Sequence, residues 1–208
     1  MISNHDRSGW IGASDVQFVI GNWKTKTWEK WWMQKLGINQ DHFDNKYTVA
    51  GTNWEHRILE SLGLPDLEMD RQIILEDLRL RVNLDGNTQT RIKECKTYKL
   101  DGQKGMRIAT PVCGLVRNDR AWKPPQKYIN QTHVQVFGAW MSGMQIMGAD
   151  IVAYGLEEAD YDNFLRPIDP QRLQEIPVEY DRKWIEGVYL PKHMILCDCL
   201  KKGVFPDV

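Results

Sequence analysis

The chain has 208 residues, of which 42% are hydrophobic and 26% charged, and its formal net charge is -1 at pH 7. This length and composition are typical of one globular domain with a sizeable core, so we expect a single domain over residues 1–208. No stretch approaches the ~18 consecutive apolar residues of a membrane span, and the N-terminus lacks the basic flank and apolar run of a signal peptide. We therefore expect a soluble cytoplasmic protein with no membrane partner.

The cysteines exclude two further classes. Four cysteines are too few and too unevenly spaced for a disulfide scaffold, and none are paired as C-x-x-C, the spacing typical of a zinc site. This small number of unpaired cysteines is typical of a protein in a reducing compartment.

The charge is unevenly distributed along the chain. Residues 79–127 carry 12 Lys and Arg against 4 Asp and Glu, whereas the segments on either side are net acidic. Such a basic segment indicates either a polyanionic partner or an ordinary solvated face, and composition alone leaves both open.

The hydrophobic spacing predicts two helices in the first third. The first begins at a Thr25 or Thr27 cap and ends at Gly37, with an apolar side made of Trp28, Trp31, Trp32 and Leu36. Its tryptophans could stack on bases, but aromatic residues at helical spacing more often form core, which is the interpretation we favour. The second helix spans residues 50–62 and carries Glu55.

A β-hairpin follows. Leucine and valine alternate with polar residues over 78–85, which predicts a strand with one buried face. Asp85-Gly86-Asn87 has turn chemistry, and a second strand is expected over 90–98. Because side chains alternate along a strand, Glu94 and Lys96 should share one face.

The remaining pattern predicts a mixed sheet flanked by helices. Residues 99–125 form a basic excursion, a helix begins near Gln126, strands are expected at 146–154 and 176–180, and a helix at 181–202. The fold class is therefore α/β or α+β around one sheet.

Three carboxylates and one ammonium converge if the hairpin is correct. Asp85, Glu94 and the backbone carbonyl of Cys95 form a sensible ligand set for Mg²⁺, and Glu55 would reach it directly or through water. A bound cation activates water, and Lys96 would orient the resulting nucleophile toward a phosphodiester. The alternative is an exposed hairpin face without activity.

Asp85 followed by Glu94-x-Lys96 resembles the Asp…(Asp/Glu)-x-Lys signature of the restriction-enzyme-like, PD-(D/E)xK nucleases. Three further blocks lie in matching order: Ile11-Gly12-Ala13-Ser14-Asp15-Val16 with Val19-Ile20-Gly21, Gly51-x-x-Trp54-Glu55, and Tyr128-x-x-Gln131-x-x-x-Gln135 with Gly138. Over roughly residues 7–145 the chain thus resembles the lambda-exonuclease and YqaJ-type viral recombinase family.

The resemblance implies a restriction-endonuclease-like core and a Mg²⁺-dependent DNA exonuclease, with Mn²⁺ as a substitute. Such an enzyme degrades linear double-stranded DNA 5′→3′ and leaves a 3′ single strand for phage-type recombination. Its implied partners are DNA ends, a single-strand annealing protein and further copies of itself, commonly in a trimer, in the host cytoplasm.

The resemblance also assigns roles to residues. Asp85, Glu94 and the Cys95 carbonyl would bind the metal, with Glu55 at a second metal position and Lys96 orienting water. Contacts to substrate or water would come from Gln131 and Gln135. DNA would be bound by Arg7 and Ser14 at the 5′ phosphate, where Arg7 could equally be a solvated arginine, and elsewhere by Lys99, Lys104, Arg107 and Tyr128.

Three alternatives stay open. An endonuclease uses the same metal core, and a non-catalytic DNA-binding scaffold could retain the fold. The iron–sulfur nucleases of CRISPR adaptation need four clustered cysteines, which this spacing does not favour. The distance of about thirty residues between Lys96 and Tyr128 exceeds the family pattern, so the role of the excursion is open.

Overall fold

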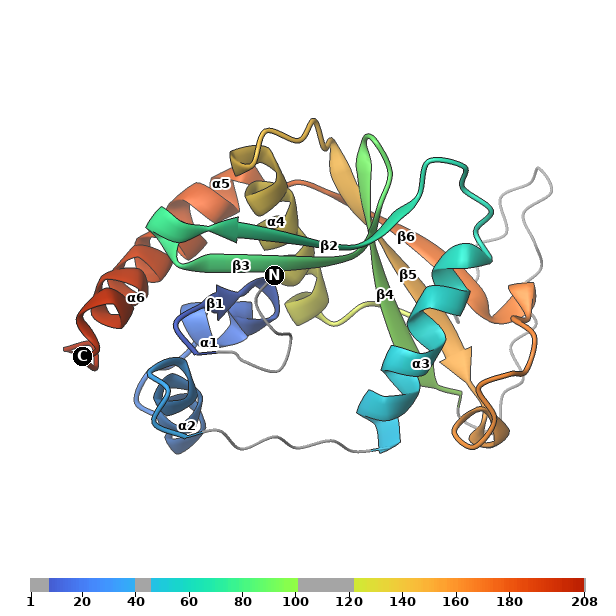
Figure 1. Ribbon diagram of the computed structural model, residues 1–208, viewed down its shortest axis with the longest axis horizontal. Coiled ribbons are helices and arrows are strands. Elements are labelled where there is room, and N and C mark those ends of the chain that lie inside the picture. Colours follow the sequence, from blue (N-terminus) through green and yellow to red (C-terminus); the bar gives the residue numbers. More distant parts are fainter. Residues whose placement is uncertain (1–7, 40–45, 101–121, 208) are drawn as a thin grey trace.

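A computed structural model describes residues 8–39, 46–100 and 122–207 of the protein (Figure 1). Within these residues the chain forms one mixed six-stranded sheet. Strand β2 pairs with one edge of β3. The other edge of β3 pairs with β4, which is followed in the sheet by β5 and then β6, and the short β1 also pairs with β3. The β1–β3 and β4–β5 pairs are parallel and the others antiparallel. The strands are β1 Ile11–Gly12, β2 Glu68–Leu75, β3 Leu80–Asn87, β4 Arg91–Lys99, β5 Gly148–Leu156 and β6 Leu173–Glu179.

The predicted helices are present. Thr25 caps α2 by accepting a hydrogen bond from the backbone N–H of Trp28 at 3.1 Å. The C-terminal helix contains one π-helical turn, Ile185–Tyr189, between α5 and α6. The helices are α1 Val16–Ile20, α2 Lys26–Lys35, α3 Lys46–Glu60, α4 Gln126–Met141, α5 Arg182–Trp184 and α6 Leu190–Lys202. None of the described helices is long and apolar enough to cross a membrane.

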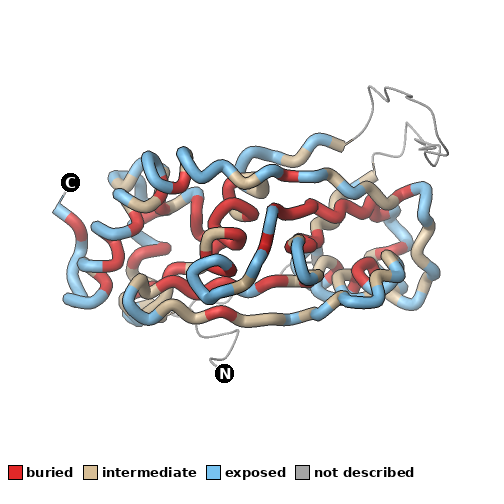
Figure 2. Tube along the Cα trace, turned by 90° about the horizontal axis from the view of Figure 1, so that it is seen from above, coloured by how far each residue is buried: buried red, intermediate tan, exposed pale blue. Residues whose placement is uncertain are grey.

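Two hydrophobic cores lie on opposite faces of the sheet. Helix α3 covers one face, where Trp54 and Ile58 pack with Cys95 and Tyr154. Helix α4 covers the other face together with α1, α2 and α6. A Cβ added at Gly138 of α4 would meet a methyl group of Val82 at 2.6 Å, so glycine permits the close approach of α4 to β3. Figure 2 shows the buried residues along the central strands and the inner sides of these helices.

The tryptophans of α2 belong to the core, which confirms the favoured interpretation. Trp28, Trp31 and Trp32 are buried and pack against one another and against Phe18. They are therefore not available to stack on bases.

Two sequence predictions were wrong in detail. Asp85-Gly86-Asn87 lies inside β3, because Gly86 pairs with Lys93 and Asn87 with Ile92, and the turn is formed by the next three residues. Strand β2 was not predicted at all. It is an edge strand in which only Ile73 is buried, so it lacks the alternation that marks a half-buried strand.

The alternation expected along β4 is confirmed. Glu94 and Lys96 share one face and contact each other. Arg91 and Lys93 point to the opposite face and pair with Asp150 of β5, at 2.8 and 2.9 Å.

Candidate active site

The site lies where β3 and β4 separate. The two strands pair only at Gly86–Lys93 and Asn87–Ile92, after which β4 stays paired with β5 and turns away from β3 (Figure 1). The backbone N–H of Cys95 would continue the ladder, but instead it donates to Oδ2 of Asp85 at 2.8 Å. In a strand the N–H and C=O of one residue point to the same edge, so the Cys95 carbonyl faces the same gap. This agrees with its expected place in a ligand set.

Glu94 is the centre of the site. Its side chain is fully buried, and its Oε1 accepts from Lys96 Nζ and from Gln131 Nε2, the latter at 2.5 Å. Its Oε2 accepts from Nε2 of Gln135, which also donates to the carbonyl of Asn83 at 3.2 Å. The two glutamines are four residues apart on α4 and therefore lie on one side of it. Helix α4 thus fixes the carboxylate of β4.

Negative charge exceeds positive charge in this gap. Burial raises the pKa of Asp85 well above its usual range, and the nearby Glu94 carboxylate raises it further. Burial and Glu94 also raise the pKa of Glu55, against the opposing effect of Lys96. The Lys96 pKa is raised by Glu94 and Asp85 although burial opposes this. Three carboxylates therefore share one ammonium, which is a favourable environment for an added cation.

The residues present fit a hard divalent cation. Oε1 of Gln135 is buried without a hydrogen-bond partner among the described atoms, although it lies next to Glu94. Such an acceptor is normally satisfied, and a hydrated cation would supply the missing donor. The available ligand atoms are carboxylate, amide and carbonyl oxygens, which favours Mg²⁺ or Mn²⁺ over the softer metals.

A second group of ligand-type side chains lies beside Glu55. Ligand atoms of Glu55, His56 and Asp70 are within 4.8 Å of one another, and His56 Nε2 is 2.9 Å from an Asp70 carboxylate oxygen. The side chains of His56 and Asp70 are 51% and 63% exposed, so this is a solvated ion pair adjoining the site. Sequence reasoning missed Asp70 because β2 was not predicted.

The predicted DNA contacts are dispersed. Tyr128 borders the site, since Lys96 Nζ lies 5.2 Å from its ring centre. Lys99 is exposed at the end of β4 and pairs with Glu158 at 3.4 Å. Ser14 is exposed on the 3₁₀ helix Ala13–Asp15, which packs against α4 and β3. Three other predicted contacts, Arg7, Lys104 and Arg107, lie outside the described residues.

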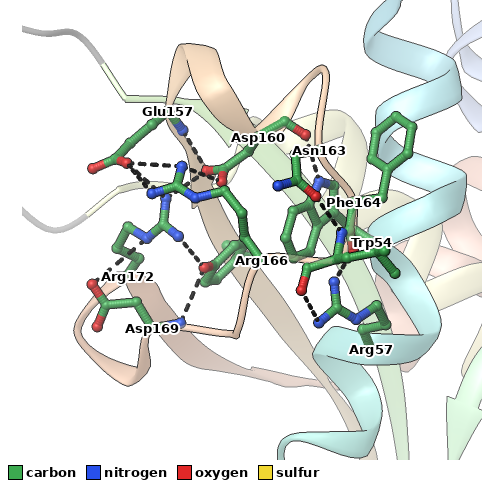
Figure 3. Close-up of polar contacts among 11 residues, drawn as sticks. Trp54, Arg57, Glu157, Asp160, Asn163, Phe164, Arg166, Asp169 and Arg172 are labelled. Carbon is green, nitrogen blue, oxygen red and sulfur yellow. Dashed lines mark hydrogen bonds and ion pairs between the residues drawn. The ribbon is translucent and has the colours of Figure 1, made fainter.

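A buried polar network holds the helix that carries Glu55 (Figure 3). The Asp160 carboxylate accepts from Arg166 and Arg172 at 2.7 and 2.5 Å, and the Asp160 carbonyl accepts from the Trp54 indole at 2.9 Å. Trp54 is the neighbour of Glu55 on α3, so this contact limits rotation of the helix. No spacing in the sequence indicates the contact between Trp54 and Asp160, because the two residues lie 106 positions apart.

Solved structures share this fold. An alkaline exonuclease from Laribacter hongkongensis is similar with a TM-score of 0.63 and 17% identity, over 94% of this chain and 90% of that chain. A phage-related exonuclease from Haemophilus somnus is similar with a TM-score of 0.53 and 14% identity, over 93% of this chain and 95% of that chain. No protein-family model and no curated protein sequence matches the chain. The fold expected from the sequence resemblance is thereby confirmed.

Proposed function

We propose that the chain is a divalent-cation-dependent deoxyribonuclease, an exonuclease that degrades one strand of linear duplex DNA from its 5′ end. The proposal depends on one observation: Lys96, Gln131 and Gln135 all donate hydrogen bonds to the Glu94 carboxylate. This carboxylate lies beside the gap between β3 and β4 that the Asp85 side chain enters. The fold shared with two exonucleases over more than nine-tenths of the chain supports it.

A divalent cation, when bound, activates a water molecule and neutralises charge on the phosphodiester. Asp85, Glu94 and the Cys95 carbonyl would hold it, with Glu55 at the margin of the site. We propose Mg²⁺ as the ion and Mn²⁺ as its substitute, because the donors are oxygen atoms.

Lys96 serves as a cationic hydrogen-bond donor in this mechanism. The Glu94 and Asp85 carboxylates raise the pKa of Lys96, so the ammonium stays protonated at neutral pH and does not act as a general base. Its ammonium would orient the attacking water and stabilise charge on the phosphoryl oxygens. Gln131 and Gln135 hold the Glu94 carboxylate in one orientation, which keeps the acceptor oxygens fixed during the reaction.

The recombination context is proposed from the sequence resemblance. Arg7 and Ser14 would bind the terminal 5′ phosphate and thereby set the direction of digestion. The 3′ single strand that remains would be passed to a single-strand annealing protein, and the chain would act as a homo-oligomer, with a trimer as the expected form.

The experiment compares linear duplexes carrying 5′-phosphate or 5′-hydroxyl ends with covalently closed circles, in Mg²⁺, Mn²⁺ and EDTA. We expect loss of the linear DNA only, dependent on the metal and faster with 5′ phosphate. Glu94→Ala should abolish the loss, whereas Glu60→Ala, an exposed glutamate on the same helix as Glu55, should not.

The other outcomes decide between the alternatives. Cutting of circles would replace the exonuclease with an endonuclease on the same site. Absence of cleavage of either substrate in either metal would favour a DNA-binding scaffold, or an enzyme that needs an absent partner, over the proposed activity of the chain alone.

A further inference from the structure

Three aromatic rings form a stack beside Lys96. Tyr98 of β4 lies nearly parallel to Trp122, with ring centroids 5.3 Å apart and 11° between the planes. Trp122 meets Tyr128, in the first turn of α4, at 6.3 Å and 32°. Lys96 Nζ is 5.2 Å from the centre of the Tyr128 ring, and the same ammonium binds Glu94. The ring stack, Tyr98–Trp122–Tyr128, therefore borders the candidate active site directly.

The ring stack is not part of either hydrophobic core. All three side chains are partly exposed, whereas the tryptophans of α2 are buried. The Tyr98 hydroxyl accepts a hydrogen bond from Nε2 of Gln174 at 2.9 Å, which fixes the ring against β6. A rigid aromatic surface that is open to solvent, and not needed to fill a core, is suited to binding a planar ligand.

Lysines accompany two of the rings. Lys123 follows Trp122, and Lys127 precedes Tyr128, with Lys127 Nζ 4.9 Å from the centre of the Tyr128 ring. Both lysines are exposed. Aromatic faces interleaved with ammonium groups are typical of sites for single-stranded nucleic acid, where rings stack on bases and cations bind phosphates. Inside an intact duplex the base faces are already stacked on one another and cannot be used in this way.

We propose that Tyr98, Trp122 and Tyr128 form a stacking site for unpaired bases next to the reacting phosphodiester. This inference rests on the proposed function and deepens it: the site takes a single strand, or the melted end of a duplex, rather than a closed double helix.

The test measures binding without cleavage. A fluorescently labelled oligothymidylate and a capped hairpin duplex are titrated with the protein in EDTA. Trp122→Ala should weaken single-strand binding about tenfold and leave duplex binding unchanged, because stacking contributes about 1–3 kcal/mol per base. Trp122→Phe, which keeps a ring, should restore most of the affinity. The matched control is Trp140→Ala, a solvent-exposed tryptophan that meets Tyr180 edge-to-face at the other end of α4.

A second measurement covers the case in which Trp122→Ala does not fold. An oligonucleotide with 2-aminopurine at its unpaired end should be quenched by the wild-type protein, and Tyr98→Leu should relieve part of the quenching. The absence of quenching by the wild-type protein would overturn the proposal.

The remaining outcomes separate this proposal from the proposed function. Unchanged single-strand affinity in Trp122→Ala, or an equal loss in Trp140→Ala, would overturn the stacking site even if linear DNA is digested. A Trp122-dependent single-strand affinity in a protein that cuts no DNA would support the stacking site and remove the catalytic role.

Discussion

The backbone N–H of Cys95 donates to the Asp85 carboxylate at 2.8 Å, at the point where β3 and β4 leave each other. A side chain thus replaces the next rung of the β-ladder. The same arrangement turns the Cys95 carbonyl and the Asp85 carboxylate toward one gap, so the interruption of the sheet brings together the oxygen atoms proposed to bind the cation.

Asp85→Asn should stabilise the metal-free protein while it removes activity. Burial and Glu94 penalise the charged carboxylate, as the raised pKa of Asp85 shows, whereas an amide oxygen can still accept from Cys95. A gain of about 1 kcal/mol corresponds to a rise in Tm of about 2–4 °C for a chain of this size. Thermal unfolding in EDTA checks this, and cleavage should fall about 10³-fold. A lower Tm would show that the charge is compensated within the protein.

Lys96→Met should destabilise the fold because it leaves the buried Glu94 carboxylate without its cation. Removing one partner of a buried ion pair costs about 3–5 kcal/mol. The double variant Glu94→Gln/Lys96→Met removes both charges and should recover most of that loss in a urea unfolding curve. Both variants should be inactive. If the double variant is no more stable than Lys96→Met, the pair is not coupled as the structure indicates.

His193 should make the fold sensitive to mild acid. Its Nε2 is 2.8 Å from the Leu78 carbonyl and its Nδ1 is 3.0 Å from the Tyr189 hydroxyl, and burial lowers its pKa to about 4. In the unfolded chain His193 binds a proton near pH 6.5, whereas in the folded chain it does so only near pH 4. The contribution of His193 to the free energy of unfolding is therefore constant above pH 6.5 and falls as the pH drops toward 4. The loss is about 3 kcal/mol. Urea unfolding at pH 7 and pH 5 should show about 2 kcal/mol of this loss, because pH 5 is still above the folded-state pKa, and in His193→Gln the difference should be smaller.

Asp160→Ala should destabilise the protein through Arg172. Both side chains are buried, and the substitution removes the carboxylate nearest to the guanidinium, at 2.5 Å, leaving only Glu157 and Asp169 at 3.7 Å, at a cost of about 3–5 kcal/mol. Glu186→Ala is the control, because it removes an exposed ion pair with Arg182 and should leave the Tm unchanged. Similar melting temperatures for the two variants would contradict the role of the network.

Local patterns predicted much of the fold. The alternation over residues 78–85 corresponds to β3 from Leu80 onward, whereas Leu78 lies in a short 3₁₀ helix. The helical spacing of Trp28, Trp31 and Trp32 corresponds to the buried side of α2. Edge strand β2 escaped prediction because solvent reaches most of its residues. The Asp85-Gly86-Asn87 turn was wrong because strand pairing overrode a local turn preference.

The candidate site was predictable only where its residues are close in sequence. Glu94 and Lys96 are two apart and share a face by periodicity, which is a local property. The resemblance assigned Gln131 and Gln135 to the site as contacts to substrate or water, and their hydrogen bonds to Glu94 were not predicted. The contact from Trp54 to Asp160 depends on tertiary packing, for which the sequence offered no signal.

The two hydrophobic cores give the site one further property. Gln131 and Gln135 reach Glu94 from the helix of one core, and Glu55 lies on the helix of the other. A folding intermediate with only one core formed would hold an incomplete set of these groups. Assembly of the full set therefore coincides with completion of the tertiary structure, so that the proposed activity would itself report that folding has finished.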